Sequence, residues 1–182
     1  MNGDSIRMII RKILRGELSQ VCDLQIASWR AAYANVLPAS FLKVDIKNAL
    51  NAHWSREPGD NWIVLGAWQG AYLLGFVALD LTHEGGPYID NLHVSPEVHR
   101  RGTGRALMAD LARRLIELKQ ETCWLTVIES NTRARAFYRA LGGVEGPVRG
   151  ECILGYPVDA YPVRWADMSA LKRMSRGSSR NS

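Results

Sequence analysis

The feature that most constrains the fold is an apolar strand that ends at Val94 and leads, through a turn with two glycines, into a helix. Gly102 and Gly104 lack Cβ atoms, so a ligand can approach the backbone closely at this turn. The first turn of a helix leaves N–H groups without intrahelical partners, and the helix dipole makes that end partly positive. The turn therefore predicts a site for a phosphate or pyrophosphate. Three arginines add positive charge at the same place: Arg100, Arg101 and Arg105.

The motif also has a simpler interpretation, a tight turn between a strand and a helix, which the motif alone leaves open. Two better-known nucleotide motifs are excluded. Leu107 stands where a dinucleotide-binding fingerprint needs its third glycine. A P-loop is excluded because no Gly-Lys-Ser/Thr sequence follows the turn.

Length and composition favour one globular domain, because the chain has 182 residues and a hydrophobic content of 47%. No apolar run is long enough to span a bilayer. The N-terminus lacks the charged start and the apolar stretch of a signal peptide. We therefore expect a cytoplasmic protein without a membrane partner.

The formal net charge is +5 and the pI is about 9.3, with much of the excess in a serine-rich, basic C-terminal stretch. We expect a folded domain over residues 6–171 and a disordered tail over residues 172–182. Because the basic residues gather in this tail and no DNA- or RNA-binding motif is present, we expect no nucleic-acid partner.

The three cysteines, Cys22, Cys123 and Cys152, have no close pairing in sequence, which favours reduced thiols in a reducing compartment. Each is expected to be a small, buried, apolar residue. The four histidines lack metal-ligand spacing, so we expect no metal site.

The hydrophobic pattern predicts one mixed α/β domain. Ser40 is expected to cap the second helix, and Asn131 opens the last one. The expected elements are a strand at 8–14, helices at 18–33 and 40–54, strands at 62–68, 72–81 and 88–94, a helix after Gly102, a strand at 123–128, a helix at 131–141, and short strands at 152–154 and 160–165.

This order and four local motifs resemble the GNAT superfamily of acyl-CoA-dependent N-acetyltransferases. Residues 94–104 resemble the family's Val-x-Pro and its acyl-CoA loop, Arg/Gln-x-x-Gly-x-Gly/Ala. Residues 131–142 resemble its Asn-x-x-Ala-x-x-Phe-Tyr helix, which ends in glycine. The other two motifs are Trp-Arg-Ala-Ala-Tyr with a following Leu-Pro, at 29–38, and Val-Arg-Trp-x-Asp, at 163–167. The resemblance runs from about residue 8 to residue 171.

The resemblance implies an α/β (α+β mixed) fold with a central, mostly antiparallel, twisted sheet of about seven strands. This sheet is splayed between the fourth and fifth strands and flanked by about four helices. The implied activity is direct transfer of an acetyl group from acetyl-CoA to a primary amine of a small molecule, amino acid or peptide. The implied cofactor-binding residues are Leu92, His93, Val94, His99, Arg100, Arg101, Gly102, Thr103, Gly104, Arg105, Asn131, Arg133 and Phe137.

Four further residues receive a role from the resemblance, and each keeps a structural alternative. Tyr138 matches the family's acid for the leaving thiolate but could be a core tyrosine. Asp90 is the first candidate for the base that takes the amine proton, through a water, or it is an acid at a strand edge. His93 and Glu84 are the other options for the base, with a packed imidazole and a solvated loop charge as their alternatives. Trp29 and Tyr33 lie one helical turn apart and would line the acceptor cleft, or belong to the core.

The sequence also departs from the family pattern. His99 and Arg100 replace the usual loop residues, although neither change removes a backbone N–H donor. Gly143 stands where a phenylalanine is usual, and Tyr88 where many members carry a glutamate base. The last difference leaves a second hypothesis, a catalytically inactive sensor that binds acyl-CoA. The sequence identifies no acceptor amine and leaves open whether the chain forms a homodimer.

Overall fold

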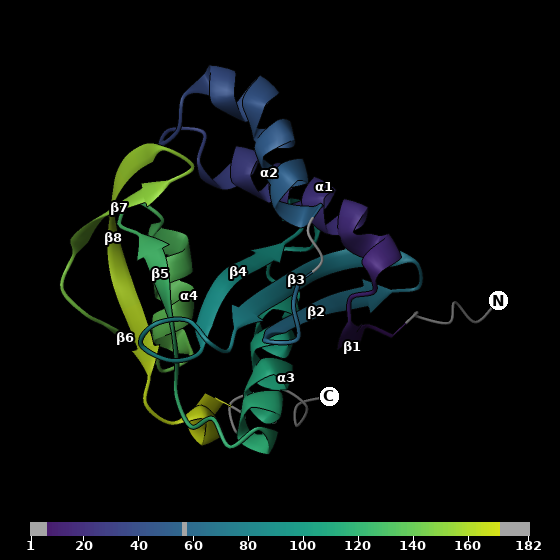
Figure 1. Ribbon diagram of the computed structural model, residues 1–182, viewed down its shortest axis with the longest axis vertical. Coiled ribbons are helices and arrows are strands. Elements are labelled where there is room, and N and C mark those ends of the chain that lie inside the picture. The colour runs from purple at the N-terminus through teal and green to yellow at the C-terminus, as the bar shows by residue number, and fades with distance from the viewer. Residues whose placement is uncertain (1–6, 56–57, 172–182) are drawn as a thin grey trace.

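The computed structural model describes residues 7–55 and 58–171, so the predicted tail and the predicted boundary at residue 6 lie outside the described residues. The elements in chain order are β1 (Ile9–Lys12), α1 (Leu18–Ala32), α2 (Ile46–Trp54), β2 (Trp62–Gln69), β3 (Tyr72–Asp80), β4 (Tyr88–Val94), α3 (Thr103–Glu117), β5 (Cys123–Ile128), α4 (Thr132–Ala140), β6 (Val144–Glu145), β7 (Arg149–Ile153) and β8 (Tyr156–Trp165). A π-helical segment, Phe41–Asp45, leads into α2 (Figure 1).

One twisted sheet organises the described chain, with the strand order β1-β2-β3-β4-β5-β8-β6 and with β7 paired to β8. Every neighbouring pair is antiparallel except β4 and β5, which are parallel. These eight strands and four α-helices confirm the expected mixed α/β fold. Strand β6, with two residues, is the one that the sequence analysis did not anticipate.

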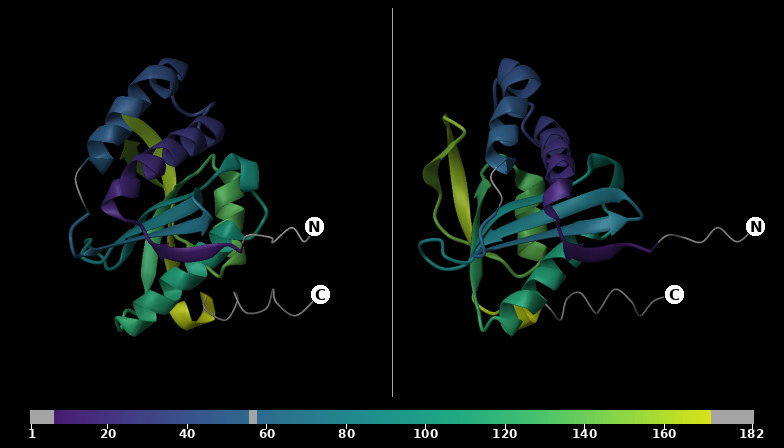
Figure 2. Two further views of the ribbon diagram at one scale, coloured as in Figure 1. Left: turned by 90° about the vertical axis from the view of Figure 1, so that its right-hand side faces the viewer. Right: turned by 45° about the vertical axis from the view of Figure 1, so that its right-hand side comes forward.

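Helices cover both faces of the sheet (Figure 2). Helices α1 and α2 bury an apolar stripe that includes Val21, Ile46 and Trp54 against one face of β2 and β3. Helix α3 buries Leu107, Leu111 and other residues against the opposite face. Leucines at helical spacing in the sequence produce this second stripe.

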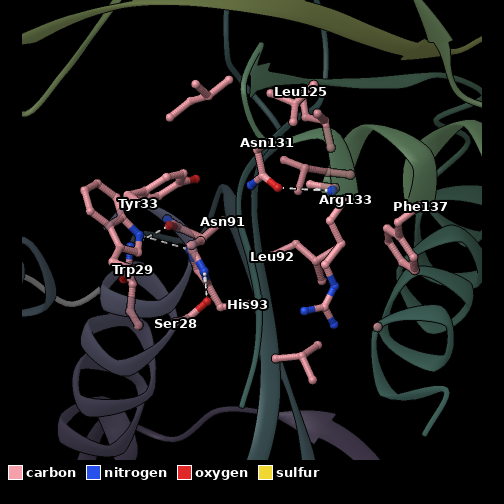
Figure 3. Close-up of a pocket in the computed structure, with 18 of the residues that line it drawn as sticks. Ser28, Trp29, Tyr33, Asn91, Leu92, His93, Leu125, Asn131, Arg133 and Phe137 are labelled. Atoms are coloured by element: carbon pink, nitrogen blue, oxygen red, sulfur yellow. Dashed lines mark hydrogen bonds between the residues drawn. The ribbon is translucent and has the colours of Figure 1, made fainter. Parts of the chain in front are cut away.

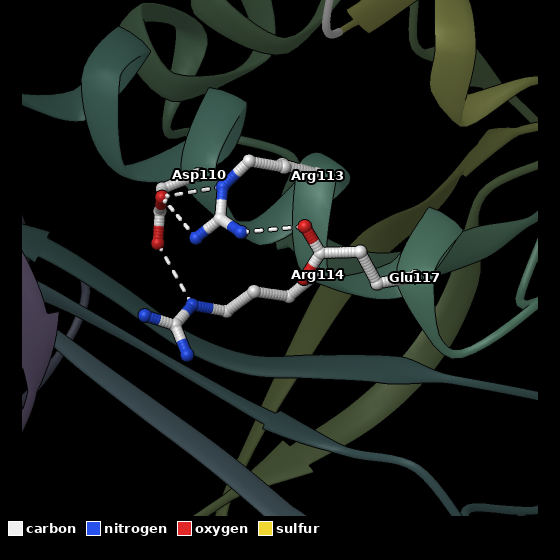
Figure 4. A network of polar contacts seen from close by, with 4 residues as sticks. All are labelled: Asp110, Arg113, Arg114 and Glu117. Carbon is white, nitrogen blue, oxygen red and sulfur yellow. Dashed lines mark hydrogen bonds and ion pairs between the residues drawn. The ribbon is translucent and has the colours of Figure 1, made fainter.

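The outward face of α3 carries a polar network instead (Figure 4). Asp110 accepts hydrogen bonds from Arg113 and Arg114, and Arg113 also pairs with Glu117. Each bonded pair is three or four residues apart on the helix, so the network supports the helix locally. It lies outside the cleft described below.

Strands β4 and β5 separate almost as soon as they pair. Their only bridge joins Tyr88 to Trp124, whereas β5 pairs with β8 over six residues, from Cys123 to Ile128. The splay expected between the fourth and fifth strands is therefore confirmed. Because unpaired backbone groups of parallel strands need partners, this gap is a place for a ligand to bind.

Two local expectations were wrong. Ser40 makes no capping hydrogen bond, because the chain already has helical backbone angles at this residue and continues into the π-helical segment. Cys152 is exposed on β7, while Cys22 and Cys123 are buried as expected. On β7, Cys152 is exposed and alternates with Glu151 and Ile153, which are half-buried.

The absence of a side chain at Gly143 has a packing reason. A Cβ atom at this position would lie 2.6 Å from Val163 Cγ1 and 2.8 Å from Trp165 Cζ2. The indole of Trp165 is buried and donates a hydrogen bond to the Leu141 carbonyl over 3.0 Å. The indole therefore fills the space that a larger residue at position 143 would need.

This packing predicts that Gly143→Ala lowers the free energy of unfolding by about 1–3 kcal/mol, because either Trp165 or the backbone must move. Urea denaturation measures the loss. Gly150→Ala is the matched control, since a Cβ atom there meets nothing within 4 Å. Its effect should stay within about 0.5 kcal/mol. Equal stability of the two variants would contradict this account of Gly143.

Candidate functional site

A cleft of about 960 Å³ opens where β4 and β5 separate. Its walls come from α1, α2, β4, β5, the first turn of α3, α4 and the β7–β8 hairpin. Figure 3 shows Ser28 and Trp29 of α1, and Tyr33 directly after it, on one side of β4, with Phe137 of α4 on the other. All but one of the site residues predicted from the sequence line this cleft. The exception is Arg101, which is exposed beside it.

One end of the cleft is formed by the turn before α3. Gly102 is the N-cap, with a left-handed φ of 81°, and it offers no side chain to cap the helix. The first turn of α3 contains no acidic residue either. The N–H groups of residues 103–105 therefore point out of the helix start without intrahelical partners. Such an end is suited to bind an anion.

Positive side chains surround this helix start. Arg100, Arg105 and Arg133 all line the cleft, and Figure 3 shows Arg133 extending beside Leu92. Arg135 is different, because it forms an ion pair with Glu145 over 2.9 Å. Of the arginines on α4, it is therefore Arg133 that can bind a ligand in the cleft.

One backbone N–H of β4 faces the gap between β4 and β5. The Ser95 N–H donates to the Leu74 carbonyl of β3 over 2.9 Å. Because backbone groups alternate along a strand, the Val94 N–H points away from β3, toward the splay. The Val94 carbonyl accepts a hydrogen bond from His99 Nε2 over 3.0 Å. A ring nitrogen that donates in this way is protonated, which assigns the tautomer of His99.

The second wall of the gap carries the predicted Asn131 and Tyr138. Asn131 Oδ1 accepts a hydrogen bond from the Ala134 N–H over 3.1 Å, so Asn131 caps α4. Tyr138 is buried, and its ring meets that of Trp165 edge to face, with 5.9 Å between centroids. Burial raises the pKa of the Tyr138 phenol, and nearby Tyr33 and Tyr88 raise it further. Tyr138 thus keeps its proton throughout the neutral pH range.

Three side chains of α1 and β4 form a fixed cluster at the opposite end of the cleft. The Trp29 indole donates to His93 Nε2 over 3.4 Å, and His93 Nδ1 lies 3.0 Å from Ser28 Oγ (Figure 3). Because an indole can only donate, Nε2 is the unprotonated nitrogen and Nδ1 donates to Ser28. Trp29 also contacts Tyr33 edge to face, with centroids 5.2 Å apart.

The same end holds a carboxylate and an imidazole. Asp90 Oδ2 lies 4.0 Å from His53 Nε2, and both residues line the cleft. Desolvation in the cleft raises the pKa of Asp90, and His53 opposes that effect. His53 was missed by the sequence analysis, because nothing in its local sequence places α2 against the end of β4.

No group of three or more metal-ligating side chains occurs among residues 7–55 and 58–171. Within the same part of the chain, no helix combines the length and apolar character needed to cross a membrane.

Comparison with known families assigns the chain. The sequence model described as the Acetyltransferase (GNAT) family matches residues 19–142, which include α1, the turn before α3 and α4. This chain belongs to the GNAT acetyltransferase family. The match covers both the expected acyl-CoA loop and the Asn-to-Tyr helix, so the resemblance seen in the sequence is confirmed at the level of the family.

Individual GNAT relatives are more distant. A 59-residue stretch, 32% of this chain, is 41% identical to the ribosomal protein bS18-alanine N-acetyltransferase of Escherichia coli K12, and it spans 40% of that enzyme's length. An uncharacterized N-acetyltransferase of Bacillus subtilis, YuaI, is 24% identical over 176 residues, 91% of this chain and 96% of the relative.

Solved GNAT structures share the fold. The PaiA N-acetyltransferase of Thermoplasma acidophilum, solved with coenzyme A, gives a TM-score of 0.67 at 20% identity and covers 87% of this chain and 99% of its own. The E. coli ribosomal-protein-S18-alanine N-acetyltransferase gives 0.65 at 21% identity, with 87% and 92% covered.

The fixed cluster at Trp29 predicts a pH dependence of stability. Burial lowers the pKa of His93 from 6.5 to about 4. Between these values the unfolded chain binds a proton that the folded chain does not, so stability falls as the pH falls. Wild type should lose about 2 kcal/mol more unfolding free energy than His93→Gln between pH 7 and pH 5. Urea denaturation at both pH values measures the difference, and equal losses would contradict it.

Proposed function

We propose that this protein is an N-acetyltransferase that transfers an acetyl group from acetyl-CoA directly to a primary amine. The observation that carries the proposal is the cleft itself. One end of it contains the uncapped start of α3 among arginines, and the other end contains Asp90 and His53. Membership of the GNAT family supports it. So do the coenzyme A and acetyl-CoA complexes of structural neighbours.

The residues at the helix start fit a pyrophosphate. The N–H groups of residues 103–105 would bind its oxygens, and Arg100, Arg105 and Arg133 would neutralise its charge. Gly104 packs against Phe137, since a Cβ atom there would lie 3.2 Å from the Phe137 ring. A side chain at position 104 would therefore press on Phe137, which lines the cleft.

The separated strands fit an extended arm that ends in a thioester. Leu92 and Val94 of β4 line one side of the gap, and Leu125 and Val127 of β5 line the other. The Val94 N–H, which faces the gap, would polarise the thioester carbonyl as an oxyanion donor does. Much of the rate would come from holding the amine and the thioester together.

Tyr138 would complete the transfer. When the amine nitrogen attacks, the carbon–sulfur bond breaks and the electron pair remains on sulfur. The Tyr138 hydroxyl then donates a hydrogen bond and its proton to that sulfur, and solvent restores the phenol. Burial raises the pKa of this phenol, so at neutral pH it carries its proton and can donate a hydrogen bond when the thiolate forms.

The acceptor is proposed to be a primary amine of a small molecule, amino acid or peptide. The relative that acts on the alanine of a ribosomal protein makes a peptide amine a suitable first probe. Trp29 and Tyr33 would contact the acceptor from α1, and the exposed Leu154 from the β7–β8 hairpin.

We expect Tyr138→Phe to lower turnover about 10²–10⁴-fold, because it removes the proton donor and leaves the ring beside Trp165 in place. Turnover is measured as thiol release from acetyl-CoA with short alanine-initiated peptides, polyamines and amino acids as acceptors. Coenzyme A affinity, measured by calorimetry, should be nearly unchanged.

Tyr72→Phe is the matched control, because Tyr72 is 77% exposed at the start of β3 and does not line the cleft. It should keep wild-type turnover. Near-normal turnover of Tyr138→Phe would remove Tyr138 from the mechanism. Coenzyme A binding by the wild type without turnover of any amine would favour the inactive sensor instead.

A further inference from the structure

A chain of hydrogen bonds runs from the core to the carboxylate in the cleft. Trp54 Nε1 donates to Gln25 Oε1 over 2.6 Å, and Gln25 Nε2 donates to Asn91 Oδ1 over 2.7 Å. Asn91 Nδ2 in turn donates to Asp90 Oδ2. Gln25 and Asn91 are only 2% and 8% exposed, so neither amide is a surface group that happens to point inward.

The direction of this chain is fixed by its buried end. An indole N–H is a donor only, so the Gln25 oxygen must face Trp54 and its nitrogen must face Asn91. The Asn91 oxygen therefore faces Gln25, which leaves its nitrogen for Asp90. The chain can end only on an acceptor, and it thus holds one carboxylate oxygen of Asp90 in place.

A β-bulge brings the last two members to the same side of the sheet. Leu79 of β3 pairs with Ile89, and the preceding Ala78 pairs with Asn91, so Asp90 is the extra residue. Without the bulge, neighbouring residues on β4 would face opposite sides. With it, Asn91 reaches α1, and Asp90 reaches His53 on α2.

His53 lies beside this carboxylate, whose own side chain is 32% exposed, and it also reaches solvent. Its side chain is 45% exposed, its Nε2 lies 4.0 Å from Asp90 Oδ2, and its ring meets Trp54 edge to face. The other charged or titratable groups that act on Asp90 are Asp80 of β3 and His83 of the loop before β4. Of these neighbours, His53 has the largest effect on the pKa of Asp90, which it lowers, and it lines the cleft with Asp90.

We propose that Trp54, Gln25 and Asn91 are positioning residues that hold the Asp90 carboxylate as the proton acceptor for the amine, with His53 passing the proton to solvent. The inference rests on the proposed function, since it assumes an amine acceptor. In the step, an N–H bond of the ammonium breaks, its electron pair stays on nitrogen, and the proton forms an O–H bond with Asp90. The proton then leaves through His53, which restores the carboxylate.

The first test needs no acceptor. Carboxyl ¹³C NMR titration gives the pKa of Asp90 directly in wild type, Asn91→Leu and His53→Gln. Both variants should raise that pKa by about one unit, since each removes a group that stabilises the ionised carboxylate. Cys22→Ala is the control, because Cys22 is buried between α1 and α2 with Asn51 and lies outside the chain of hydrogen bonds. It should leave the pKa unchanged.

The second test asks whether this carboxylate accepts the proton. The acid limb of the kcat/KM profile, measured with an alanine-initiated peptide, should coincide with the NMR value in wild type and move with it in both variants. Asn91→Leu should also lower kcat about 10²-fold at the optimum, through the misplaced carboxylate. Gln25→Met provides a second variant with the same expected direction should Asn91→Leu fold poorly.

The outcomes separate the two proposals. An unmoved Asp90 pKa in Asn91→Leu and His53→Gln would overturn the positioning role whether or not any amine is acetylated. A pKa that moves while the acid limb stays fixed would overturn Asp90 as the proton acceptor. Absence of turnover with every amine would count against the proposed function and leave the titration to decide the positioning role.

Discussion

The early separation of β4 from β5 is the constraint on which the rest of the site depends. A sheet normally satisfies the backbone of each strand through its neighbour, yet here β4 and β5 share a single bridge, Tyr88 to Trp124. Beyond it, β4 leads into the start of α3 and β5 leads into the start of α4. The gap thus ends between two helix starts, one uncapped at Gly102 and one capped by Asn131. That asymmetry makes the α3 end the one available to an anion.

The two ends of the cleft differ in the sign of the charge they can stabilise. The α3 end gathers Arg100, Arg105 and Arg133, whereas the α1–α2 end presents Asp90 beside His53. A polyanionic acyl donor and a cationic amine would therefore enter from opposite sides and meet at the gap. The neutral His93 contributes no base, because the lone pair of its unprotonated nitrogen accepts the Trp29 indole N–H.

The sequence predicted correctly those features that depend on neighbouring residues in the chain. The glycine turn before α3 and the Asn131 cap follow from backbone conformation and capping, and both are as expected. The position of the bulge at Asp90 could not be predicted from the sequence, because it depends on pairing with β3. Gln25, Asn91 and His53 were missed, since their contacts link residues 29 to 66 positions apart in the sequence. Arg101 was placed in the site by its neighbours in sequence, but the turn directs it outward.

Hydrogen–deuterium exchange with and without coenzyme A tests the central claim, that the splayed strand and the uncapped helix start form one binding surface. The account predicts slower exchange on binding at the amides of Leu92, Val94 and residues 103–105, the groups that face the gap or leave the helix start. The Ser95 amide, already bonded to the Leu74 carbonyl, should change little. Protection confined to other parts of the chain, or none at saturating coenzyme A, would contradict the account.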